Sequence, residues 1–190
     1  MGGCEWLQGM LTKNLIDFIL KFVASNMYTY QNAYLTALDM ISSGRASREV
    51  LSYLALSAER SAESESVSSI LVLDESGVLR NGASPRLPGD YLKAIDGLVP
   101  NPEVGTCAAA AATGRIVITE NFFEDSKWAE LRHLPLALGF KGAWSFPIKN
   151  PEGKVIGTFG TYFKSTRQPT KREIDGTQML AKAAAVAINR

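Results

Sequence analysis

The feature that most constrains the fold is a strand–turn–strand pattern that occurs twice in this sequence. The first copy runs from residue 67 to residue 84 around the turn Asp-Glu-Ser-Gly, and the second runs from residue 142 to residue 164 around Asn-Pro-Glu-Gly. A type I turn prefers Asp or Asn at its first position and Gly at its last, and Pro suits the second position. The flanking residues are apolar and β-prone. The pattern therefore predicts two antiparallel hairpins.

The section between the hairpins, residues 88–139, has a mixed character. It contains three short helical patterns, GDYLKAIDGL, TCAAAAATG and SKWAELRHLPLAL, and one strand pattern, RIVITEN. Because helical patterns also precede the first hairpin and follow the second, the order is helix, hairpin, helical middle, hairpin, helix. This order predicts an α+β fold: a central antiparallel sheet with terminal helices packed on one face and a helical and loop cap over a pocket on the other.

The terminal segments predict helices with more apolar surface than one domain face covers. Residues 11–23 are apolar around most of a helix, apart from one polar stripe at every fourth position. We therefore expect residues 1–44 to be a helical extension that takes part in dimerisation, and residues 45–190 to form the domain. Ser47 and Thr170 are the expected N-caps of two further helices, near the start of the domain and at its end.

Composition excludes several classes of function. The 190 residues carry a formal net charge of +1 with Lys and Arg spread along the chain, so we expect no nucleic-acid partner and no membrane partner. Charges in the middle of the apolar N-terminal run also argue against a membrane span. Cys4, Cys107 and the single histidine, His133, make neither an ordinary zinc site nor a disulfide framework. No metal is therefore expected, and the cytoplasm is the expected location.

Taken together, these features resemble the GAF domain, a small-molecule-sensing module of signalling proteins, over residues 45–190. The stretches that carry the resemblance are SSILVLDESGVLRNGASPRLP, VGTCAAAAATGRIVITEN, WAELRHLPLALGFKGAWSFPI and GKVIGTFGTYF, followed by the closing helix. The chain is most similar in style to GAF modules joined to PAS domains, histidine kinases and cyclic-di-GMP enzymes. The resemblance implies a pocket between the sheet and the middle section, and terminal helices that often dimerise.

Candidate ligand-binding residues follow from the pocket that the resemblance implies. Small-molecule sites are usually apolar with a few polar groups, so aromatic residues are natural candidates for the lining. We expect ligand contacts from Phe122, Trp128, Trp144, Phe146, Tyr162 and Cys107. Because side chains alternate along a strand, Trp144 and Phe146 share one face of the sheet and Ser145 faces the other. At least one of these sets is then buried without being a site.

The stretch VGTCAAAAATGR, residues 104–115, raises two alternatives for Cys107. With Thr106 as N-cap, Cys107 falls at the first helical position, where a helix N-terminus lowers a thiol pKa and makes a reactive thiolate accessible. The five alanines that follow predict instead a thin helix that lies close to the sheet, with Cys107 as a small buried side chain. We favour the packing interpretation.

The resemblance also brings subfamily alternatives. Bilin-binding members use a cysteine usually beside a histidine, whereas Cys107 precedes an alanine; haem-binding members need an axial histidine, for which the chain offers His133. Cyclic-nucleotide members carry an Asn-Lys-Phe-Asp-Glu pattern, and ENFFED lacks its lysine. Free methionine sulfoxide reductases share the fold and use cysteines in the middle section, but the second cysteine here is Cys4, outside the domain.

The expected function is therefore that of a sensor and not of an enzyme. The sensor binds a small molecule, whose identity and any cofactor are unknown, and signals through its terminal helices within or beside a two-component or cyclic-di-GMP system. The expected partners are a second copy of the chain and a kinase or other signalling output domain. The alternatives are a GAF-fold methionine sulfoxide reductase that uses Cys107, and a purely dimerising scaffold whose pocket is filled core.

Overall fold

The computed structural model describes residues 29–190. Its elements, in chain order, are the helix of residues 29–42, α2 (Ser47–Ser61), β1 (Ser66–Leu73), β2 (Leu79–Ala83), α3 (Gly89–Ile95), α4 (Thr106–Thr113), β3 (Val117–Thr119), the 3-10 helix η1 (Ser126–Trp128), α5 (His133–Ala137), β4 (Gly142–Lys149), β5 (Val155–Phe163) and α6 (Lys171–Ile188). The five strands form one antiparallel sheet in the order β2-β1-β5-β4-β3.

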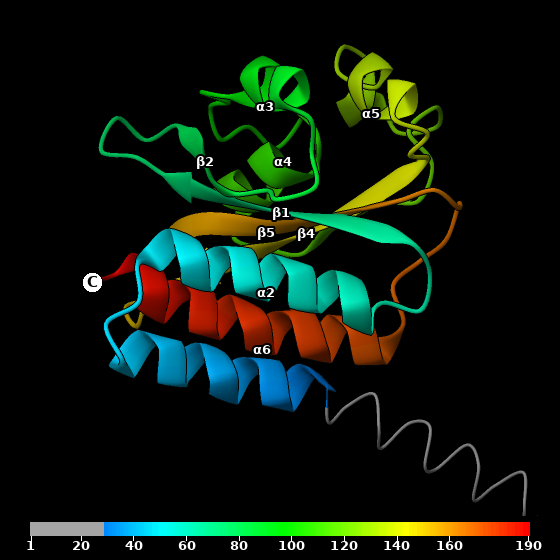
Figure 1. Cartoon of the computed structure of the whole chain (residues 1–190). Helices are drawn as coiled ribbons and strands as arrows, with labels where there is room; N and C mark the ends of the chain where they lie inside the picture. The colour runs from blue at the N-terminus through cyan, green and yellow to red at the C-terminus, as the bar shows by residue number, and fades with distance from the viewer. Residues whose placement is uncertain (1–28) are drawn as a thin grey trace, which may run out of the picture.

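The elements form layers on the two sides of this sheet (Figure 1). The helix of residues 29–42, α2 and α6 lie on one side, and α3, α4 and α5 lie on the other. The predicted α+β architecture is thereby confirmed. The cap on the second side is formed by the middle section of the sequence, between β2 and β4. This section also supplies the edge strand β3.

Both predicted hairpins are present, and local turn chemistry accounts for them. In the β1–β2 turn, Asp74 Oδ1 accepts hydrogen bonds from the backbone N–H groups of Ser76 at 2.9 Å and Val78 at 3.1 Å. The turn ends at Gly77 with a φ of +79°, a conformation that glycine adopts at little cost. In the β4–β5 turn, Asn150 Oδ1 accepts from the backbone N–H of Lys154 at 2.8 Å.

The N-caps of the two long helices differ from each other. At α6, the Thr170 side chain accepts from the backbone N–H of Glu173 and the Glu173 side chain accepts from that of Thr170, so the predicted cap is confirmed as a capping box. At α2, the N-cap is Ala46 and no side chain caps the helix. The Ser47 hydroxyl instead donates to the carbonyl oxygen of Ala187 at 2.6 Å. The prediction of Ser47 as N-cap is wrong because this distant acceptor, at the end of α6, takes its hydroxyl.

The helix of residues 29–42 packs on the outer side of the helical layer (Figure 1). Its Tyr30 ring lies against the bare backbone of Gly176 in α6, so closely that a Cβ at Gly176 would come within 2.5 Å of the ring. Ala33 and Ala37, on the same side of this helix, are buried. The part of the predicted extension that covers residues 1–28 lies outside the described residues.

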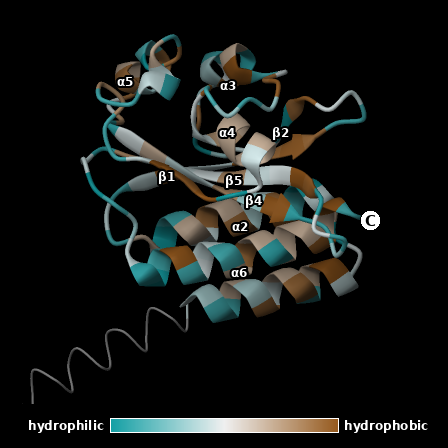
Figure 2. Ribbon diagram, turned by 180° about the vertical axis from the view of Figure 1, so that it is seen from behind, coloured by the Kyte–Doolittle hydropathy of each residue, from teal (hydrophilic) through white to brown (hydrophobic). Residues whose placement is uncertain are grey.

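The sheet separates two cores. The helix-side core lies between the sheet and the terminal helices and includes Trp144, Phe146, Phe159 and Phe163 of β4 and β5. The cap-side core lies between the sheet and the middle section and includes Tyr91, Cys107, Trp128 and Tyr162. Along α2 and α6, hydrophobic and hydrophilic residues alternate in the way expected of helices that bury one side (Figure 2).

Candidate functional site

A small cavity lies within the cap-side core, and we call it the cap-side cavity. The sheet supplies its floor, α3 and the first turn of α4 supply two of its walls, and the segment from η1 to α5 supplies the third. Its lining residues are Leu71, Tyr91, Ile95, Leu98, Val104, Gly105, Thr106, Cys107, Ala108, Trp128, Leu131, Leu134 and Tyr162. The space that a water centre can occupy inside it is about 20 Å³, which is room for about one water molecule. The cavity is therefore present but nearly filled by its own side chains.

The helix α4 lies close to the sheet because its residues are small. Thr106, Cys107 and the alanines at 108–111 are all buried. Below Cys107 the strand β5 carries Gly160, where a Cβ would come within 3.0 Å of the Cys107 sulfur. Small residues on both sides thus allow the close approach, and the packing interpretation of the alanine run agrees with this arrangement.

The start of α4 differs from the prediction. Its N-cap is Gly105, with a φ of +50°, and no side chain caps the helix, so Thr106 is the first helical residue and its predicted role as N-cap is wrong. The Thr106 hydroxyl instead accepts a hydrogen bond of 2.9 Å from Ser145 Oγ on β4. Ser145 Oγ also lies 3.1 Å from Cys107 Sγ. The thiol is thus part of a buried chain of neutral hydrogen-bonding groups.

This environment keeps the Cys107 thiol protonated. Burial raises its pKa, and the hydrogen bond with Ser145 offsets only part of that effect. The thiolate is the nucleophilic form of cysteine, so a raised pKa reduces the reactivity of the sulfur. Cys107 therefore has the properties of a structural side chain in the cavity wall.

Two tyrosines from distant parts of the chain meet above the sheet. The side chains of Tyr91 on α3 and Tyr162 on β5 both line the cavity, and their rings meet edge to face with centroids 5.8 Å apart. Burial raises the pKa of both hydroxyls, so both are neutral over the physiological pH range. The sequence prediction included Tyr162 but missed Tyr91. The available signal was the pattern GDYLKAIDGL, which places Tyr91 and Ile95 on one side of a short helix.

Trp128 forms part of another wall and is held in place by two contacts. Its indole Nε1 donates to Thr119 Oγ1 at 3.1 Å, and its ring lies 4.4 Å from that of Phe122. Phe122 is in the cap-side core but does not line the cavity. The predicted helix over residues 126–138 is divided into η1 and α5, and both Leu131 and Leu134, near the break, line the cavity.

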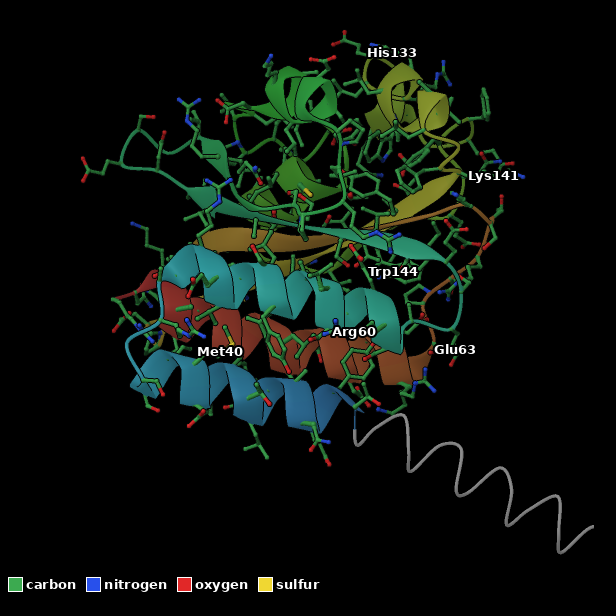
Figure 3. All side chains as sticks on the ribbon, viewed as in Figure 1. Met40, Arg60, Glu63, His133, Lys141 and Trp144 are labelled. Atoms are coloured by element: carbon green, nitrogen blue, oxygen red, sulfur yellow. The ribbon has the colours of Figure 1, made fainter. Side chains whose placement is uncertain are left out.

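Two of the predicted site residues lie on the other face of the sheet. Trp144 lies on the side of the sheet that faces the terminal helices (Figure 3). Phe146 belongs to the same helix-side core, and the centroids of the Trp144 and Phe163 rings are 3.5 Å apart. The prediction that they line the same pocket as Tyr162 is therefore wrong. The reason is the strand alternation: Ser145, between them, faces the cap, and its two neighbours must face the helices.

His133, the residue considered as a haem ligand, does not line this cavity. His133 is exposed at the start of α5 and lies at the outer edge of the cap (Figure 3). Among residues 29–190, no three His, Cys, Asp or Glu side chains are grouped in a way that could hold a metal ion. Within the same residues, no helix is both long enough and apolar enough to cross a bilayer.

Comparison with known proteins places this geometry in a family context. A family model described as "GAF domain" matches residues 44–189. The methyl sulfide methyltransferase-associated sensor of Methanosarcina acetivorans is 33% identical over 174 residues, which are 92% of this chain and 17% of that protein. The chain thus spans only a small part of the length of this relative.

Solved structures share the fold. A domain from a protein of Sinorhizobium meliloti described as a two-component sensor histidine kinase is 25% identical, with a TM-score of 0.62 over 75% of this chain and 90% of that one. A type II free methionine-R-sulfoxide reductase from Thermoplasma acidophilum is 16% identical, with a TM-score of 0.62 over 75% of this chain and 92% of that one. The fold is therefore common to sensors and to reductases, and the residues of the site have to distinguish between them.

Proposed function

Because the chain belongs to the GAF domain family, we propose that it binds a small molecule in the cap-side cavity and signals through its terminal helices. The observation that carries the proposal is the cavity itself, which is enclosed by the sheet on one side and by three separate cap segments on the other. A ligand in the cavity touches α3, α4 and the η1–α5 segment at once. The strands β1 and β5, which form the floor of the cavity, pack with their other face on α2 and α6. A shift of these strands on ligand binding would therefore act directly on the terminal helices.

A sensor function is also supported by the relatives. One relative is a sensor by name, and a solved structure comes from a protein described as a sensor histidine kinase. We infer a two-component or cyclic-di-GMP system as the setting, a second copy of the chain as a partner, and the cytoplasm as the location. Because the chain spans 17% of its sensor relative, an output domain in the same polypeptide fits this setting.

The reductase alternative has less support from the site. Reduction of a sulfoxide by cysteine needs a thiolate and usually a second thiol that resolves the oxidised intermediate. Cys107 is 6% exposed, its thiol is bonded to Ser145, and burial raises its pKa. A buried neutral thiol is poorly suited to attack a substrate, so we infer that the chain is not an enzyme.

The experiment compares one variant at the cavity with a matched variant elsewhere on the cap. Val104 is half-buried and lines the cavity, whereas Val99 is 63% exposed and does not. A low-molecular-mass cell extract should raise the melting temperature of the wild type and of Val99→Phe but not of Val104→Phe, because a ligand stabilises the folded state that binds it. Hydrogen exchange should slow in α6 under the same conditions. An extract that stabilises Val104→Phe equally, or that stabilises none of the three proteins, contradicts the proposal.

A further inference from the structure

The lining of the cap-side cavity contains no charged side chain. Its polar side-chain groups are the hydroxyls of Tyr91, Tyr162 and Thr106, the Cys107 thiol and the indole of Trp128, and its other side chains are aliphatic. The Trp128 N–H is bonded to Thr119, and both the Thr106 hydroxyl and the Cys107 thiol are bonded to Ser145. The tyrosine pair is thus the polar group that is best placed to meet a ligand.

Two ion pairs of the surrounding cap form outside the cavity. Arg80 binds Asp96, which directly follows α3, at 2.6 Å, and Lys127 in η1 binds Asp125 at 2.8 Å. None of these four residues lines the cavity, so neither pair supplies a charge inside it. The cavity groups cannot supply the charge themselves, because burial raises the pKa values of both tyrosines and of the thiol.

An ion that enters an enclosed site loses its hydration and needs an opposite charge or several donors in return. The first turn of α4 does line the cavity, and a helix N-terminus favours negative charge. However, α4 has only eight residues, and the dipole effect at a helix end is small compared with the cost of stripping water from an ion. The free energy of transfer into the cavity therefore favours an uncharged ligand over an ion.

We propose that the cap-side cavity selects a small neutral molecule with an apolar body and one hydrogen-bonding group, which contacts the Tyr91–Tyr162 pair. This inference rests on the proposed function, because it names the ligand class of the same cavity. Both tyrosines line the cavity side by side and each neutral hydroxyl carries a proton, so the pair can donate a hydrogen bond to an accepting atom of the ligand. The cavity as it stands has room for about one water molecule, so binding of such a ligand requires α3 or α5 to move outward. Haem, bilins and cyclic nucleotides carry carboxylates or phosphates and fall outside this class.

The test uses probes of similar shape and different charge on the full chain. Benzyl alcohol and benzaldehyde are neutral, benzoate is an anion, and benzylamine is a cation at pH 7; acetone and acetate form a smaller pair. Methyl NMR signals of Ile95 and Leu131 report occupancy of the cavity, with Val104→Phe as the blocked variant and Val99→Phe as its control. We expect the neutral probes to cause saturable shifts of these signals and to bind at least about tenfold more tightly than either ion. These shifts should be absent in Val104→Phe and present in Val99→Phe.

A second variant tests the hydrogen bond. The double variant Tyr91→Phe with Tyr162→Phe removes both hydroxyls and should weaken benzaldehyde binding by about threefold to tenfold while leaving toluene binding unchanged, because only benzaldehyde accepts a hydrogen bond. Equal or tighter binding of benzoate, or no saturable shift with any neutral probe, overturns the inference about ligand class. If a cell extract still stabilises the protein in a Val104-dependent way, the proposed sensor function survives that result. If neither extract nor probe of any charge acts at the cavity, both fail.

Discussion

At the scale of single residues, the helix position of Cys107 favours a thiolate, but its burial favours the neutral thiol. It occupies the first turn of a helix, where a thiolate is favoured, yet it is 6% exposed and hydrogen-bonded to a serine. Burial decides the outcome, because the thiolate loses more hydration than the end of a short helix returns. The residue is therefore better understood as part of the packing between α4 and β5.

We predict that the Cys107 thiol is chemically protected in the folded protein. In a Cys4→Ser background, a thiol reagent such as DTNB at pH 8 should label Cys107 only as fast as the domain opens, and labelling should become rapid in denaturant. Cys107→Ala should remain folded, at a cost of about 1–2 kcal/mol for the lost sulfur packing. Rapid labelling of the native protein, or methionine sulfoxide reductase activity that Cys107→Ala removes, would instead support the enzyme alternative.

Glu173 is the second residue whose surroundings decide its role. It is 2% exposed, and Arg167 donates to both of its carboxylate oxygens at 2.7 Å. The Arg167 guanidinium also lies over the Trp144 and Phe163 rings, at 4.8 and 4.3 Å. Burial acts to raise the Glu173 pKa, but hydrogen bonds from Arg167 and from the backbone N–H groups of Thr170 and Glu63 outweigh it and lower the pKa.

The lowered pKa of Glu173 predicts how stability depends on pH. Its contribution is fully present above its ordinary pKa of 4.5 and is lost as the pH falls through the lowered folded-state value. Glu173→Gln should therefore reduce the free energy of unfolding by about 3 kcal/mol at pH 7, and the difference from wild type should shrink as the pH falls below 4.5. Urea unfolding at a series of pH values measures this. A difference that stays constant down to pH 3 would rule out the ion pair as its source.

At the scale of secondary-structure elements, the contact between α6 and the helix of residues 29–42 depends on a missing side chain. The Tyr30 ring occupies the space beside Gly176, and burial, followed by the nearby Glu173 charge, raises the Tyr30 pKa to about 12. The same region of α6 therefore contributes Glu173 to the ion pair with Arg167 and Gly176 to the contact with Tyr30. Tyr30 thus packs on α6 beside the ion pair, and Arg167 of that pair lies over Trp144 of β4 and Phe163 of β5.

We predict that Gly176→Ala loosens the helix of residues 29–42 although alanine is the better helix former by about 1 kcal/mol. A Cβ at this position would lie 2.5 Å from the Tyr30 ring, so the ring and its helix must move. Hydrogen exchange should become faster at residues 29–42, and the free energy of unfolding should fall. In a double-mutant cycle, Tyr30→Ala should remove most of the cost of Gly176→Ala. A Gly176→Ala variant that is more stable than wild type would contradict this account of the contact.

At the scale of the whole molecule, apolar side chains remain exposed on the terminal helices. Leu35, in the helix of residues 29–42, is 61% exposed, and Val186 on α6 is 47% exposed. These helices form the face of the molecule opposite the cap (Figure 1). Because apolar groups on a helical face favour association, we predict that this face binds the same face of a second copy and joins the terminal helices of two chains.

The expected result for the full chain is a dimer that Leu35→Glu weakens by placing a charge in the interface. Light scattering at micromolar concentration measures the mass, and Val99→Glu serves as the control because Val99 is equally exposed but lies on the cap side. A monomeric wild type would disprove the dimer. A dimer that resists Leu35→Glu would mean that association uses another surface.

The sequence by itself was sufficient for features that depend on neighbouring residues. The two hairpins follow from turn residues within four positions of each other, and the capping box of α6 follows from Thr170 and Glu173 three positions apart. The order of these local units was enough to predict the antiparallel sheet, its two helical layers and the family. The alternation in β4 likewise showed that Trp144 and Ser145 point to opposite faces.

Only the tertiary structure decided which of those faces belongs to the cavity. Alternation gives the relative direction of neighbouring side chains, but the absolute direction depends on how the sheet packs against helices far away in sequence, and Trp144 was therefore misplaced. Ser47 bonds to Ala187 across 140 positions, and Tyr91 meets Tyr162 across the whole middle section. Such pairings are set by packing between distant segments and have no local sequence signature, which is why the cavity could be expected while most of its lining could not.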